Sequence, residues 1–141
     1  MKKVLFTNPN GREVEVDDIH LLKRGLIDDF NNYWMQGSGD GYFDYYVDGK
    51  RVSTLLLGPN VNEGLYLHFV DRVDKKDLLS LKDITKLHEV AETAEEIYAS
   101  KGLFLEKLVA WDAICYFFDY GGPCPHVKWI TPDLIPADGN W

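Results

Sequence analysis

YFDYYVDGKRVSTLLL, residues 42–57, joins two runs of strand-forming residues through one Asp-Gly pair. Tyr42–Val47 is rich in aromatic and β-branched residues, and Arg51–Leu57 has the composition of a return strand. Asp-Gly is a favoured two-residue hairpin loop, because both positions of a tight turn require positive φ. The stretch therefore predicts two paired antiparallel strands.

The flanking segments extend this hairpin into a meander. Further strands are predicted at Lys3–Thr7, Glu13–Val16, Leu65–Val70 and Val127–Ile130. The first two flank Asn8-Pro9-Asn10-Gly11, a strong turn signal, and should form a second hairpin. The charged residues 71–86 are expected to be a loop.

Two segments have the apolar spacing of helices. In residues 19–33 the apolar positions are Ile19, Leu22, Leu26, Phe30 and Tyr33. Asp17 and Asp18 precede them as candidate caps. Leu105–Tyr120 is apolar nearly all round, which predicts a buried helix that ends at Gly121. We therefore expect one α+β domain, residues 1–141, in which an antiparallel β-sheet (meander) packs against two α-helices.

Residues 84–100 fit two interpretations. Apolar residues at Ile84, Leu87, Ala91, Ala94 and Tyr98 have helical spacing. The same segment can also be divided into two strands, 87–93 and 96–99, joined by a short turn. Periodicity alone favours the helix.

Composition restricts the class of partner. The chain has 141 residues and a net charge of −8, from 15 basic and 23 acidic side chains. A nucleic-acid binder needs Lys and Arg to neutralise phosphates, so we expect no direct nucleic-acid partner. The acidic balance suits a basic protein partner instead. No apolar run approaches a membrane span or a signal peptide, which predicts a cytoplasmic protein with no membrane partner.

Motifs for catalysis or metal binding are incomplete. KLHEVAE contains His88 and Glu89 but has Glu92 where a metalloprotease needs its second His. PCPH contains Cys124 and His126 but lacks the second Cys of a zinc deaminase. We therefore predict no catalytic residue, no metal, no cofactor and no enzyme activity. A small metal- or thiol-dependent hydrolase that uses His88, Glu89, Cys124 and His126 is the alternative.

A surface constellation is the remaining candidate site. Because side chains alternate along a strand, Tyr66 and His68 should face outward if Leu65, Leu67 and Phe69 face the core. Tyr is enriched at protein interfaces. The candidate contact residues are Tyr42, Asp44, Tyr46, Tyr66, His68 and Asp71. A solvated sheet face with good strand propensity is the competing interpretation.

The segment EEIYASKGLFLEKLVAWDAICYFFDYGGPCPHVKWITPDLIPADGNW, residues 95–141, resembles the bacterial immunity proteins of polymorphic toxin and contact-dependent inhibition systems, in particular immunity family one. An alanine, an aromatic pair, a glycine turn, a proline and a tryptophan carry the resemblance. These are Ala113, Phe117–Phe118, Gly121 or Gly122, Pro125 and Trp129.

The resemblance implies a protein without catalytic activity. Proteins of this kind bind a co-inherited toxin C-terminal domain, often a nuclease or a nucleic-acid deaminase, and block its active site or substrate groove. Toxin contacts vary in the family, so none is carried over. The resemblance also favours strands within residues 84–100, and it makes Cys124 and His126 incidental to a turn. A generic protein-interaction adaptor is a further alternative.

Overall fold

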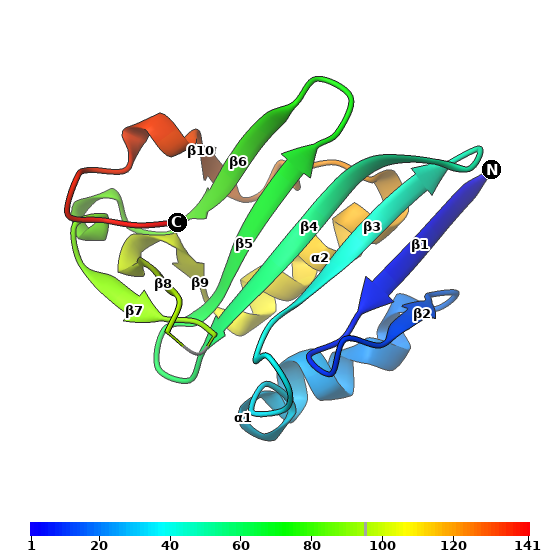
Figure 1. Cartoon of the computed structure of the whole chain (residues 1–141), viewed down its shortest axis with the longest axis horizontal. Coiled ribbons are helices and arrows are strands. Elements are labelled where there is room, and N and C mark those ends of the chain that lie inside the picture. Colours follow the sequence, from blue (N-terminus) through cyan, green and yellow to red (C-terminus); the bar gives the residue numbers. More distant parts are fainter. Residues whose placement is uncertain (95) are drawn as a thin grey trace.

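The chain folds as a large antiparallel sheet with helices on one face, so the predicted α+β class is confirmed (Figure 1). The computed structural model describes residues 1–94 and 96–141. Within them, the main sheet has eight strands in the order β10-β6-β5-β4-β3-β1-β2, with β9 paired to the start of β5. These strands are β1 (Lys2–Thr7), β2 (Glu13–Glu15), β3 (Gly41–Val47), β4 (Lys50–Asn60), β5 (Gly64–Asp71), β6 (Lys76–Leu81), β9 (Phe104–Leu105) and β10 (Lys128–Ile130).

The predicted central hairpin is confirmed in β3 and β4. Asp48 and Gly49 have φ values of 51° and 81°, as a tight primed turn requires. Tyr42 pairs with Leu56, and the register shifts after Tyr45 so that Val52 is an extra residue in β4. This β-bulge sets which side chains of the first part of β4 reach each face.

Helix α2 (Lys107–Tyr120) covers the inner face of the sheet. Its buried residues are Ala110, Trp111, Ala113, Ile114 and Phe117. Leu108 is 64% exposed, so the helix is buried along one face and the expectation of a helix buried on all sides is wrong. The helix ends, as predicted, at Gly121, whose φ of 70° is in the left-handed region.

The N-terminal helical segment is broken, where the spacing predicted one helix. A 3₁₀ turn η1 (Ile19–Leu22), a π-helical turn η2 (Arg24–Asp28) and a short α1 (Phe30–Tyr33) follow one another. Asp18 caps the first of these by accepting a hydrogen bond from the His20 N–H. A Cβ on Gly25 would lie 2.7 Å from the Tyr33 ring, so the close packing of this ring depends on glycine.

The segment between β5 and α2 is more ordered than the sequence indicates. The expected loop at residues 71–86 contains β6, which pairs with both β5 and β10. The strand interpretation of residues 84–100 is confirmed. A 3₁₀ turn η3 (Ile84–Lys86) precedes a hairpin of β7 (Val90–Glu92) and β8 (Tyr98–Ser100). Residue 95 lies outside the described residues.

Apolar side chains pack on both faces of the sheet. The main cluster fills the space between the inner face, α2 and the N-terminal helical segment. A second cluster lies on the outer face under β7–β8 and the C-terminal segment, with Tyr66, Leu79, Leu87, Ala99, Leu103, Phe104 and Ile130 buried. Figure 1 looks onto this outer face, with α2 behind the sheet. In the described chain, no helix is long and apolar enough to cross a membrane.

Candidate functional site

The outer face of β1, β3 and β4 lies beside the second cluster and retains partly exposed side chains. Strand pairing brings them together, because paired residues of antiparallel strands share a face. Lys3 pairs with Tyr46, Tyr42 with Leu56, and Leu56 with His68. We call this surface the open face and define it by Lys3, Leu5, Tyr42, Tyr46, Leu56 and His68.

Three of the predicted contact residues lie on the open face. Tyr42 is 36% exposed, and Tyr46 and His68 are partly buried. Tyr66 is on the same side of the sheet but is only 8% exposed, because Phe104 and the second cluster cover it. Tyr66 is therefore not available to a partner in this structure.

The two acidic residues that were expected to contact a partner, Asp44 and Asp71, instead accept hydrogen bonds within the fold. Asp44 is 4% exposed, and its carboxylate accepts a hydrogen bond of 2.6 Å from the Thr54 hydroxyl. Asp71 pairs with Ser53, whose hydroxyl contacts the loop after α2, so Asp71 lies on the inner side. Its carboxylate accepts the N–H groups of residues 73 and 74 and thereby caps the turn between β5 and β6.

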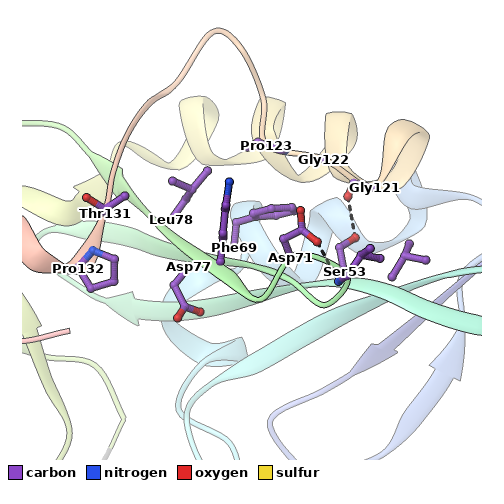
Figure 2. A pocket seen from close by; sticks show the side chains of 13 residues that line it. Ser53, Phe69, Asp71, Asp77, Leu78, Gly121, Gly122, Pro123, Thr131 and Pro132 are labelled. Carbon is purple, nitrogen blue, oxygen red and sulfur yellow. Dashed lines mark hydrogen bonds between the residues drawn. The ribbon is translucent and has the colours of Figure 1, made fainter.

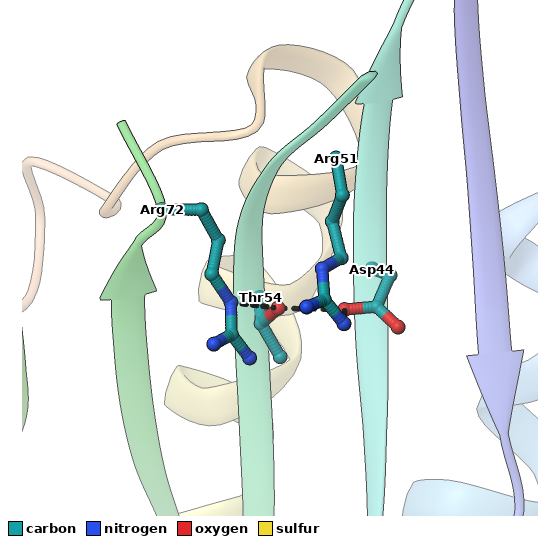
Figure 3. A network of polar contacts seen from close by, with 4 residues as sticks. All are labelled: Asp44, Arg51, Thr54 and Arg72. Carbon is teal, nitrogen blue, oxygen red and sulfur yellow. Dashed lines mark hydrogen bonds and ion pairs between the residues drawn. The ribbon is translucent and has the colours of Figure 1, made fainter. Parts of the chain in front are cut away.

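Two arginines that the sequence did not single out lie at the end of the open face (Figure 3). Arg51 Nη1 is 3.7 Å from Asp44 Oδ1, and Arg72 Nε donates to Thr54 Oγ1 over 3.1 Å. Strict alternation counted back from Leu57 would place Arg51 on the inner side. The bulge at Val52 turns it outward, and no sequence signal announces that bulge.

His68 lies between the open face and the second cluster. Its Nε2 is 3.0 Å from Asp77 Oδ1, and its ring stacks on Tyr66 with centroids 6.4 Å apart. The Trp141 ring packs edge-on against the imidazole, with ring centroids 5.3 Å apart. These contacts hold the imidazole in place and leave its side chain 16% exposed.

A separate apolar pocket of about 770 Å³ opens on the inner side, between the loop after α2 and strands β5 and β6 (Figure 2). Its walls include Val52, Phe69, Leu78, Pro123 and Pro132. This volume is within the range of small-molecule sites. Three polar side chains on its walls are paired within the fold: the Ser53 hydroxyl donates to the Gly121 carbonyl over 2.6 Å, Asp71 accepts two backbone N–H groups, and Asp77 contacts His68.

The residues of the hydrolase alternative are not assembled into a site. Cys124 is 2% exposed within the main cluster, whereas His126 is exposed and lines a different pocket. Glu89 is 3.8 Å from Lys101. Burial first, and then the charges of Asp112 and Asp119, raise the pKa of Cys115 to about 11. Across residues 1–94 and 96–141, no three His, Cys, Asp or Glu side chains are grouped to hold a metal ion.

No protein-family model, curated protein or solved structure matches the chain. The resemblance of residues 95–141 to immunity family one therefore stays a prediction. Two of its motif residues contribute to the packing of the fold. Phe117 is buried in the main cluster, and Trp129 packs against that cluster and donates a hydrogen bond to the Cys124 carbonyl over 2.9 Å.

Proposed function

We propose that the protein is an immunity protein that binds a co-inherited, basic toxin domain in the cytoplasm, without catalysing a reaction. The toxin domain is a nuclease or a nucleic-acid deaminase, and binding blocks its active site or substrate groove. The observation that carries this proposal is the open face, where Tyr and Leu side chains remain partly exposed beside the buried second cluster.

Aromatic and aliphatic side chains on the open face suit a protein partner. Tyr42 and Tyr46 lie on the same face of β3, four residues apart, with Leu5 and Leu56 on the neighbouring strands. A rigid phenol ring buries a large area at low entropic cost, and its hydroxyl can stay hydrated at the rim. A standard interface covers about 800 Å² on each partner, roughly a tenth of the 7851 Å² surface of this chain.

The net charge contributes to the rate of encounter rather than to the fit of the interface. Eight surplus negative charges attract a basic domain before contact, and this attraction weakens as salt screens it. Glu13 and Glu15 lie at the edge of the open face, because they pair with Thr7 and Leu5. We expect Glu13→Lys to slow association mainly at low salt, with little effect on dissociation.

The test is co-expression with the toxin domain encoded immediately upstream. The wild-type chain should restore growth, and Tyr42→Ala with Tyr46→Ala should weaken binding by about tenfold or more per tyrosine if each is an anchor. Tyr120→Ala is the matched control, because Tyr120 is 68% exposed on α2, which covers the inner face.

Each outcome of the test is informative. Failure of the wild-type chain to restore growth would refute the immunity function. Restored growth with unchanged affinity of the Tyr42 and Tyr46 variants, or a loss of affinity in Tyr120→Ala, would place the interface away from the open face. Affinity should be measured on purified proteins by calorimetry, so that changes in expression do not affect the comparison.

A further inference from the structure

Arg51 and Arg72, which we call the arginine pair, form a cationic spot on an acidic protein. Both guanidinium groups lie over the outer ends of β3, β4 and β5, as Figure 3 shows. Asp44 is the carboxylate of this network, so two positive charges face one negative charge. Among the described residues Arg72 forms no ion pair, and its charge is therefore not matched within the fold.

Contacts with buried polar groups orient the side chains of the arginine pair. Asp44 and Thr54 are 4% and 1% exposed. The Thr54 hydroxyl donates its proton to Asp44, which leaves an oxygen lone pair directed at Arg72 Nε. The backbone N–H of Arg72 also donates to the Val52 carbonyl over 2.9 Å. Two long side chains, which normally lose entropy when they bind, are thus partly ordered before any ligand arrives.

The network leaves most guanidinium donors available. A guanidinium group has five N–H donors, and within residues 1–94 and 96–141 the Arg72 side chain uses only Nε–H, on Thr54. Arg51 Nη1 lies 3.7 Å from Asp44 Oδ1, which is an ion-pair contact but longer than a hydrogen bond. The planar ends of both guanidinium groups can therefore donate paired hydrogen bonds to one oxyanion.

We infer that the arginine pair is a carboxylate-binding site, whose ligand is an Asp or Glu side chain of the protein partner. A carboxylate is planar and carries one charge, which matches the fork of a guanidinium and the single surplus charge of the network. A nucleic-acid backbone brings many phosphates, and the net charge of −8 would repel it. The assignment of the ligand to a toxin rests on the proposed function, whereas the site itself does not.

The site can be tested on the isolated chain with propionate as the probe and phosphate as the competing oxyanion. Nitrogen-15 NMR would follow the arginine Nε–H resonances at constant ionic strength, with Arg12 and Arg24 as internal references. Propionate should produce saturable shifts at Arg51 and Arg72 and not at the reference arginines. Equal shifts at all four arginines, or saturation by phosphate but not by propionate, would overturn the inference.

Two variants separate ligand binding from a structural role. Thr54→Val keeps both arginines but removes the hydroxyl that orients Arg72, so propionate affinity should fall about tenfold, the loss expected for one charge-assisted hydrogen bond. Arg72→Lys keeps the charge and the backbone contact but loses the fork, and it should give a similar loss. Unchanged affinity in both folded variants would overturn the site. No toxin is used, so this result is independent of the growth assay.

Discussion

Tyr66 carries a buried hydroxyl that should destabilise the fold. Its side chain is 8% exposed, and its Oη has no hydrogen-bond partner among the described residues. The hydroxyl therefore loses its water on folding and gains nothing in return. We predict that Tyr66→Phe stabilises the protein, although Tyr→Phe substitutions usually cost stability.

The expected gain follows from the cost of an unpaired polar group. Leaving a buried donor or acceptor unsatisfied costs about 1–3 kcal/mol, and phenylalanine removes this cost without changing the ring packing against Phe104. Tyr45 is the matched control, since it is also 8% exposed but donates to the Asp119 carbonyl over 3.3 Å. Tyr45→Phe should lose about 0.5–1.5 kcal/mol, so the two substitutions should have opposite signs.

Urea denaturation followed by tryptophan fluorescence and far-UV circular dichroism would measure both changes. For a chain of 141 residues, 1 kcal/mol corresponds to roughly 3 °C in Tm, so Tyr66→Phe should also raise Tm by several degrees. A Tyr66→Phe variant less stable than the wild type would refute the reasoning, because it would mean that the hydroxyl has a partner such as a buried water.

The same residue predicts a loss of stability in alkali. Burial first, and then the charge of Asp77, raise the pKa of Tyr66 above its ordinary value. Above about pH 10 the unfolded chain releases this proton while the folded chain retains it, so the free energy of unfolding falls as pH rises, by up to about 1.4 kcal/mol per pH unit. Tyr66→Phe should flatten this decline; an identical decline in the variant would contradict the assignment.

Three further predictions concern the inner side of the sheet. Phe117→Ala should cost about 3–5 kcal/mol in urea denaturation, because Phe117 is 1% exposed at the centre of the main cluster. Gly121→Ala should be more destabilising than Gly49→Ala: both have positive φ, but a Cβ at Gly121 would lie 2.5 Å from the Tyr45 ring, whereas at Gly49 it would meet nothing. Cys115, with its pKa raised from 9.0 to about 11, should carry about 100-fold less thiolate than a free thiol and react correspondingly slowly with a disulfide reagent until the protein unfolds.

The strands that the sequence predicts well are those with strong local signals. The Asp48–Gly49 pair favours the positive φ values that a two-residue hairpin turn requires, and both residues have them. The position of the central hairpin therefore follows from local sequence, without tertiary information. Strand β6 was missed for the opposite reason. Leu78 packs on the main cluster and Leu79 on the second cluster, so this strand is apolar on both faces and shows no alternation.

Part of the candidate site could also be predicted from alternation. Tyr42, Tyr46 and His68 share a face because period 2 holds along β3 and β5. Exposure could not be predicted this way, since Tyr66 is covered by residues almost 40 positions later in the chain. The broken helical segment shows the same limit: its spacing is helical, but the fit of Tyr33 against Gly25 is a tertiary contact.

The extra residue at Val52 separates the side-chain alternation of Lys50–Arg51 from that of Ser53–Leu57 in β4. Leu55 and Leu57 keep their positions in the main cluster, while Arg51 is displayed on the opposite surface. Deleting Val52 would restore regular alternation in β4, because Arg51 would then directly precede the inward-facing Ser53 and stay on the outer face, with both leucines in place. A one-codon change in length is thus absorbed at this position, and apart from Val52 itself neither face of the sheet changes the side chains that it displays.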